Sequence, residues 1–241
     1  KEKEKQVLYI HFTMDDNPSL SQSVKDRYKS LYSGAFYERF IEGKWVTAQG
    51  LVYPMFSPER HIKKCKGKFN RFYLSCDYGT VNPFSLGLWG ECDGKWFRLD
   101  EYYYSGRDNG IQLTDEEYYR ELEKLAENRE ITALIIDPSA ASFIQTVLRH
   151  GKFRVIKANN DVLTGINRVC QALKDEEIFI YPSCTDAIRE FSIYRWDDNI
   201  KKDAVKKEND HAMDDIRYFV ATVLGRENQN SSFASVAIER N

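Results

Sequence analysis

The stretch Phe72-Tyr-Leu-Ser-Cys-Asp77 is a short apolar run that ends on a carboxylate, and Ile131-Thr-Ala-Leu-Ile-Ile-Asp137 repeats the pattern. Apolar runs of this length are typical of buried strands. A carboxylate at the end of a buried strand costs free energy unless something neutralises it. In open α/β sheets, the carboxyl edge of the strands is also where ligands bind. If the two strands are parallel neighbours, Asp77 and Asp137 therefore converge at a candidate site.

The segments around these two runs predict a mixed α/β fold. Phe84–Gly90 and Lys95–Tyr104 flank Asp93-Gly94, which is a strong hairpin signal. With the first run they predict an antiparallel meander of three strands. After it, expected helices at 114–128, 141–150, 162–174, 186–194 and 211–224 alternate with expected strands at 131–136, 153–157 and 178–181. This order predicts a mixed sheet with helices on both faces.

The first seventy residues read differently from the rest of the chain. Their few short helical and extended pieces are too little to bury a core of their own. Residues 1–70 are therefore interpreted as the end of a preceding domain followed by a linker. Residues 71–226 are expected to form the main domain, and the polar stretch 227–241 a loosely held tail.

Composition limits the class of protein. With 42% hydrophobic residues the chain can form a core, and its net charge of −2 provides no global basic field for coating nucleic acid. No apolar stretch approaches the roughly 20 residues that span a bilayer. No signal peptide is recognisable, so an intracellular protein without a membrane segment is expected. The five cysteines lack a C-x-x-C spacing and are expected to be reduced thiols rather than a disulfide framework or a zinc site.

A third acidic group lies in Asn209-Asp-His-Ala-Met-Asp214-Asp215. On a helix, His211 and Asp214 project together on a face away from the apolar stripe. Asp215 lies between that face and the stripe, so periodicity leaves both aspartates open as site residues. A simpler interpretation is also open, with Asp210 as an N-cap and solvated acids in the first helical turn.

Converging carboxylates repel one another, and a hard divalent cation removes that repulsion. Mg²⁺ and Mn²⁺ both prefer carboxylate and water oxygens as ligands. The acidic residues therefore predict a metal site. For any one of them the simpler interpretation remains, since an aspartate after a strand often begins a turn, as in Asp137-Pro-Ser139.

Five short motifs resemble those of one known family. In chain order over Phe72–Thr222 they are Cys76-Asp-Tyr-Gly79, Ile135-Ile-Asp-Pro-Ser-Ala140, Gly165-Ile-Asn-Arg-Val169, Tyr181-Pro-Ser-Cys184 and Asn209-Asp-His-Ala-Met-Asp214. Together they resemble the carboxyl-terminal nuclease domain of the large terminase subunit of tailed phages, of the type found in phages and prophages of Gram-positive bacteria. His11–Pro18 and Gly43-Lys-Trp45 resemble the end of the same family's ATPase domain.

The resemblance implies an RNase H-like fold, with a mixed five-stranded sheet in which the first strand lies beside the parallel fourth. It implies that Asp77, Asp137 and Asp214 bind two Mg²⁺ or Mn²⁺ ions. The family usually has a small residue where this chain has Asp215, so Asp215 stays open as an alternative to Asp214 for the third ligand. His211 matches the family's histidine and is expected to transfer a proton or to contact phosphate.

The implied activity is metal-dependent cleavage of double-stranded viral DNA concatemers during genome packaging, in the cytoplasm of the bacterial host. Catalysis is expected to use two metal ions. The residues expected to contact DNA phosphates are Lys201, Lys202, Lys206 and Lys207. Neighbouring acids nearly cancel their charge, so a solvated hairpin is the alternative interpretation of that segment.

The implied partners are double-stranded DNA, the terminase small subunit, the portal and the ATPase domain of a longer protein. The phosphate-binding motif G-x-x-x-x-G-K-[ST] is absent from the sequence, so no ATP site is expected in this chain. Two alternatives stay open. One is another RNase H-like nuclease, of the resolvase or transposase type, and the other is a non-catalytic docking module of the packaging motor.

Overall fold

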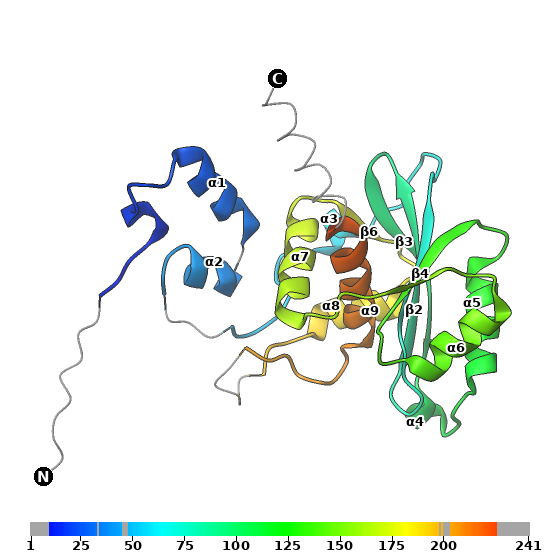
Figure 1. Cartoon of the computed structure of the whole chain (residues 1–241). Helices are drawn as coiled ribbons and strands as arrows, with labels where there is room; N and C mark the ends of the chain where they lie inside the picture. The colour runs from blue at the N-terminus through cyan, green and yellow to red at the C-terminus, as the bar shows by residue number, and fades with distance from the viewer. Residues whose placement is uncertain (1–9, 33, 45–47, 198, 200–202, 226–241) are drawn as a thin grey trace, which may run out of the picture.

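A computed structural model describes residues 10–32, 34–44, 48–197, 199 and 203–225 (Figure 1). Its centre is a six-stranded sheet in the order β5-β4-β1-β2-β3-β6. The strands are β1 (Phe72–Asp77), β2 (Phe84–Cys92), β3 (Lys95–Tyr104), β4 (Ile131–Ile136), β5 (Val155–Lys157) and β6 (Ile178–Ile180). Strands β1 to β3 pair in antiparallel fashion, whereas β4, β5 and β6 pair in parallel with β1, β4 and β3 respectively.

The mixed sheet and the parallel pairing of β1 with β4 confirm the predicted fold class. The sheet has one strand more than the five that the resemblance implied. The additional strand is β6, which lies beside the amino-terminal part of β3, where Phe97 pairs with Phe179. Its shortness follows from Pro182, since proline cannot donate a hydrogen bond to a neighbouring strand.

Helices cover both faces of the sheet (Figure 1). On one face lie α5 (Asp115–Ala126) and α6 (Ala141–His150), and on the other α7 (Val162–Lys174), α8 (Thr185–Ile193) and α9 (His211–Phe219). Each face has its own hydrophobic core. Helix α9 packs on β1 and β2 and continues into the π-helical turn η2 (Val220–Leu224). The helix with the third acidic motif therefore lies against the strand that carries Asp77.

The amino-terminal part packs against the main domain. Its elements are η1 (Met14–Asp16), α1 (Gln22–Leu31), α2 (Gly34–Phe40) and α3 (Pro58–His61), and a short α4 (Gly106–Asn109) follows β3. Val52 and Tyr53 are buried in the core beneath α7, α8 and α9. The N–H of Val52 also donates to the carbonyl of Tyr194 (3.0 Å). Part of the expected linker thus contributes to the core of the main domain.

The domain boundaries expected from the sequence, 1–70 and 71–226, stay predictions, and the expected tail 227–241 lies outside the described residues. Among the described helices, none combines the length and the apolar character that a bilayer crossing requires.

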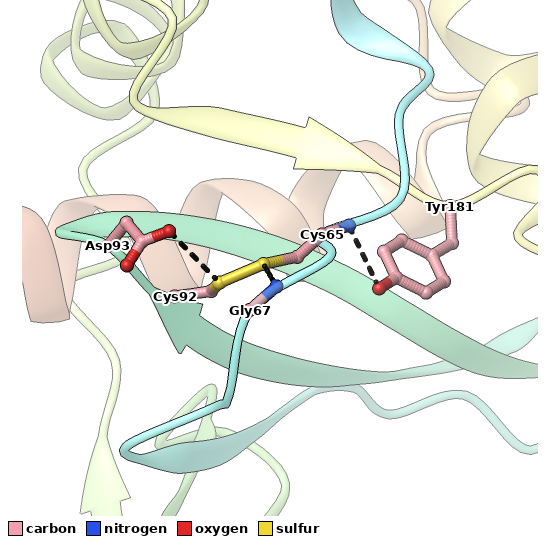
Figure 2. Close-up of a disulfide and its surroundings, with 5 residues drawn as sticks. All are labelled: Cys65, Gly67, Cys92, Asp93 and Tyr181. Atoms are coloured by element: carbon pink, nitrogen blue, oxygen red, sulfur yellow. Dashed lines mark hydrogen bonds between the residues drawn. A yellow bond between two sulfur atoms is a disulfide. The ribbon is translucent and has the colours of Figure 1, made fainter.

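Two cysteines form a disulfide, so the expectation of reduced thiols is wrong for this pair. Figure 2 shows Cys65, in the segment before β1, bonded to Cys92 at the end of β2. The two are 27 residues apart in sequence, and only the return of the chain along β2 brings them together. The disulfide ties the segment before β1 to the β2–β3 hairpin. The remaining cysteines, Cys76, Cys170 and Cys184, are buried.

Candidate active site

Two of the predicted acids meet at one edge of the sheet. Asp77 is the last residue of β1, and Asp137 directly follows β4. The two strands are parallel neighbours, with Cys76 opposite Ile136. Their carboxyl ends therefore leave the sheet together, as the two apolar runs in the sequence indicated.

The third acid comes to the same edge on α9. Asp77 and Asp214 line one cavity of about 530 Å³. Its other lining residues are Asp210, His211, Lys207, Arg107 and the β1–β2 loop, residues 78–83. Asp137 is not among the described residues that line it. The cavity is thus lined by acidic side chains, by one loop and by two long cationic side chains.

Asp77 is held in place by His211. Nδ1 of His211 lies 2.8 Å from Oδ2 of Asp77. Burial raises the pKa of Asp77 to about 6, with the hydrogen bond from His211 opposing the rise and the charge of Asp214 adding to it. Burial acts to lower the pKa of His211, but the hydrogen bond to Asp77 and the charges of Asp77, Asp210 and Glu190 together raise it. A buried carboxylate with an incompletely balanced charge fits a cation ligand.

Asp214 is paired with two cationic side chains. Nη2 and Nε of Arg217 lie 2.9 and 3.2 Å from Oδ1 of Asp214. Nζ of Lys207 lies 3.7 Å from Oδ2. Arg217 is buried, whereas Lys207 is mostly exposed. In this setting a carboxylate needs positive charge nearby, because removing it from water is costly.

Asp137 begins the turn that the simpler interpretation of the sequence allowed. Its Oδ1 accepts from the N–H of Ser139 (2.7 Å), and its Oδ2 accepts from the side-chain amide of Asn160 (3.1 Å). Burial acts to raise the pKa of Asp137, but these bonds and one from the Tyr218 hydroxyl lower it overall. Asp137 is therefore already satisfied at the edge of the sheet.

Tyr218 links the three predicted ligands. Burial raises its pKa first, and the charges of Asp77, Asp214 and Asp137 raise it further. The charges of all three aspartates thus act on one phenol. Among the described residues, however, the oxygens of these three side chains do not all lie within 4.8 Å of one another. A cation shared by all three would require the side chains to draw closer. No sequence pattern singles out Tyr218, because buried tyrosines are common in cores.

Asp215 lies in the core rather than at the cavity. Its Oδ1 and Oδ2 accept from the two terminal nitrogens of Arg98, at 3.0 and 2.7 Å. The hydroxyls of Ser75 and Ser85 donate to the same carboxylate. Asp215 and Arg98 are both fully buried. Of the two adjacent aspartates, Asp214 lines the cavity, whereas the oxygens of Asp215 are engaged in the core. Which of the two binds a metal stays a prediction.

Only two of the four lysines predicted to contact DNA are described. Lys207 lines the cavity, and its Nζ lies 3.6 Å from Oδ2 of Asp210. Lys206 is not a lining residue, and its Nζ lies 3.9 Å from a carboxylate oxygen of Glu208. Lys201 and Lys202 lie outside the described residues.

Asp210 is a further carboxylate of the cavity, and the simpler interpretation of the sequence left it open as an N-cap. It directly precedes α9, but its side chain makes no capping hydrogen bond. The side chain is 5% exposed, and Oδ1 lies 3.8 Å from Nε2 of His211. Burial raises the pKa of Asp210, and the charge of Asp214 raises it further. Asp210 thus holds the N-cap position that the simpler interpretation gave it, while its side chain lines the cavity instead of capping the helix.

The amino end of α9 is capped by Glu190, which lies on α8. One of its carboxylate oxygens accepts from the N–H groups of Ala212 (2.8 Å) and Met213 (3.3 Å), and the other accepts from the hydroxyl of Tyr103 (2.7 Å). A negative charge at the amino end of a helix is favourable. Glu190 thereby fixes the start of α9 and the place of Asp214. No local pattern predicts this cap, since the residue lies on another helix.

Known proteins resemble this chain over most of its length. No protein-family model matches it. The large terminase subunit of Escherichia phage T5 is 20% identical over 229 residues, which cover 89% of this chain and 51% of that protein. The structure of a large terminase from a thermophilic bacteriophage is 46% identical, with a TM-score of 0.82 over 90% of this chain and 55% of that one. The chain therefore spans about half the length of both relatives.

A separate nuclease structure has the same fold. The large terminase nuclease from thermophilic phage G20c with bound cobalt aligns with a TM-score of 0.51 and 8% identity, over 71% of this chain and 97% of that one. At that identity the likeness concerns the fold alone. The 46% identity to a large terminase and the shared nuclease fold lead to one conclusion. This chain is similar to the large terminase subunits of bacteriophages over about half of their length, and its fold is similar to that of a terminase nuclease.

Proposed function

We propose that this chain is a divalent-metal-dependent endonuclease domain that cleaves double-stranded viral DNA concatemers during genome packaging. Two Mg²⁺ or Mn²⁺ ions would bind at Asp77, Asp137 and Asp214. The observation that carries the proposal is that Asp77 and Asp214, from distant segments, open into one cavity. Similarity to large terminases supports the packaging role, and the cobalt in the G20c nuclease supports a divalent ion.

The donor set fits hard cations. Asp77 and Asp214 are largely buried carboxylates, and each is paired with a cationic or protonatable side chain. Asp137 would join them by exchanging its bonds from Ser139 and Asn160. When bound, such ions supply a water of lowered pKa and offset the charge on the phosphoryl oxygens.

The chain's own residues orient these ligands. His211 fixes Asp77 through Nδ1, while its Nε2 lies on the side of Asp210, 3.8 Å from that carboxylate. The imidazole can therefore accept or deliver a proton at Nε2 inside the cavity. Arg217 holds Asp214 from the buried side through Oδ1. Oδ2 of Asp214 then faces Lys207, the one of its two partners that can move into solvent.

A plasmid-nicking assay tests the activity. We expect supercoiled DNA to be relaxed and linearised with Mn²⁺ or Mg²⁺ and to stay intact with EDTA. Asp77→Asn should abolish cleavage. Asp26→Asn, which changes an exposed aspartate of α1, is the matched control and should cleave like the unchanged protein. Undiminished cleavage by Asp77→Asn would refute the assignment, and a preference for branched over linear duplex DNA would favour a resolvase-type enzyme.

Metal titration separates a nuclease from a docking module. Calorimetry with Mn²⁺ should detect binding that Asp77→Asn weakens. An absence of binding at millimolar Mn²⁺ would favour the non-catalytic alternative. In the longer protein, the proposed partners are the ATPase domain, the terminase small subunit and the portal, in the cytoplasm of the bacterial host.

A further inference from the structure

One part of the cavity is lined by the β1–β2 loop and by Arg107 of α4, and these two segments contact each other. The N–H of Arg107 donates to the carbonyl of Val81 (3.1 Å). Gly106 packs so closely on Thr80 that a Cβ would collide with the Thr80 carbonyl oxygen. The two segments therefore meet backbone to backbone, and this contact positions Arg107 beside the cavity.

Arg107 is an exposed cation that lines the cavity. Its Nη2 donates to the side-chain oxygen of Asn82 (3.2 Å), which anchors the guanidinium. Within the described parts of the chain, no carboxylate lies within ion-pair distance of it. Arginine has five N–H donors in a planar fork, so one anchoring bond leaves most of the fork available to a ligand.

The other cations that line the cavity are already paired with acids. Lys207 lies 3.6 Å from Asp210 and 3.7 Å from Asp214. His211 is bonded to Asp77 at 2.8 Å. The acids that line the cavity therefore largely balance the charges of Lys207 and His211. Among the described lining residues, Arg107 is therefore the cation whose charge is left for a ligand from outside.

We infer that Arg107 binds a backbone phosphate of the DNA strand that enters the cavity. This inference rests on the proposed nuclease function. The carboxylates that line the cavity repel phosphate. A DNA strand therefore needs an attractive contact elsewhere in the cavity to stay bound. A guanidinium suits this task, because it can bind two phosphate oxygens at once. The anchored Arg107 thus sets where the backbone passes relative to Asp77 and Asp214.

DNA binding in a non-cleaving background tests this role. In the Asp77→Asn chain, affinity for a short fluorescent duplex is measured with Mn²⁺ over about 50 to 200 mM salt. Adding Arg107→Ala should weaken binding about tenfold at the lower salt. It should also reduce the slope of log K against log salt by about 0.9, the value for one phosphate contact. A purely structural role would not change that slope.

Two further variants sharpen the test. Arg107→Lys keeps the charge without the fork, so it should preserve the salt slope while still losing affinity. Arg149→Ala removes an exposed arginine of α6 and should bind like the background protein. Equal affinity and slope for Arg107→Ala and Arg149→Ala would overturn the inference. Weak binding by Arg107→Ala together with full cleavage by Asp77→Asn would leave the phosphate contact standing and refute the proposed metal ligand instead.

Discussion

Helix α9 carries two adjacent aspartates whose surroundings differ completely. On the sheet side, Asp215 is fully buried, and both of its oxygens accept from Arg98. On the cavity side, Asp214 keeps 11% of its side chain exposed, and one of its oxygens faces only the mostly exposed Lys207. Complete internal pairing therefore marks Asp215 as a structural charge. A charge left partly unpaired at a cavity marks a candidate site.

The structural pair is built into the sheet from several strands. Gly87 on β2 leaves the space that the guanidinium of Arg98 occupies, since a Cβ there would overlap it. The indole N–H of Trp89 donates to the hydroxyl of Ser75 (2.8 Å), which in turn donates to Asp215. A buried ion pair is tolerated only with such complete hydrogen bonding. The cavity side has no equivalent network around Oδ2 of Asp214 among the described residues.

Breaking the structural pair should have the largest effect. Arg98→Met leaves Asp215 and Glu101 as buried charges without their cation, because Arg98 contacts both. We expect the free energy of unfolding to fall by about 3–5 kcal/mol, measured by urea denaturation. Arg149→Ala should leave it nearly unchanged. A loss below about 1 kcal/mol for Arg98→Met would show that the pair is not structural.

Replacing each aspartate in turn with asparagine tests directly whether Asp214 is functional and Asp215 structural. Asp214→Asn should lower the rate of plasmid cleavage by about a hundredfold or more, because even residues that only support a metal ligand commonly contribute about 10–100-fold. Its stability should fall less than that of Asp215→Asn, since Asp215 has no exposed surface. The comparison would be reversed if Asp215→Asn stayed fully stable and lost only its activity.

Replacing Lys207 should raise the affinity for Mn²⁺ in the absence of DNA. Lys207 competes with a cation for Oδ2 of Asp214, and it is 69% exposed. Exposed ion pairs of this kind contribute about 0.2–1 kcal/mol, so Lys207→Gln should raise Mn²⁺ affinity by at most about fivefold. Calorimetry without DNA measures this, with Lys206→Gln as the control outside the cavity. Equal affinities for both variants would mean that Lys207 does not compete.

The smallest expected effect is a dependence of Mn²⁺ stabilisation on pH. Burial raises the pKa of Asp77 to about 6, above its value in the unfolded chain. The folded, metal-free protein therefore binds this proton more tightly, and its stability falls as the pH rises through that range. Mn²⁺ needs the deprotonated carboxylate. The rise in melting temperature caused by Mn²⁺ should thus be larger at about pH 7.5 than at about pH 5.5, and a larger rise at the lower pH would contradict it.

Local patterns in the sequence were sufficient for much of the fold. The hairpin predicted at Asp93-Gly94 is a two-residue turn between β2 and β3, with positive φ at both positions. The capping box predicted at Thr114 and Glu117 is present at the start of α5. Such features depend on residues a few positions apart, so short-range sterics and hydrogen bonds decide them.

In the candidate site, too, some features follow from local sequence patterns and others depend on tertiary packing. The pairing of β1 with β4 brought Asp77 and Asp137 to one edge, as the apolar runs had indicated. Which acid of α9 faces the cavity was open from periodicity, because Asp214 and Asp215 lie about 100° apart on the helix. The rotation of α9 against the sheet decided it, through Arg98 on one side and the cap from Glu190 at the helix start.

The sequence by itself therefore determined the order of the elements, the class of fold and the acidic ends of two neighbouring strands. Tertiary structure alone decided that Asp215 is structural, that Asp210 and Arg107 line the cavity, and that Cys65 bonds Cys92. The physical reason is how far apart in the sequence the interacting residues lie. Turns, caps and strand patterns follow from nearby residues, whereas the pairing of a buried charge depends on which distant side chains the packed chain places beside it.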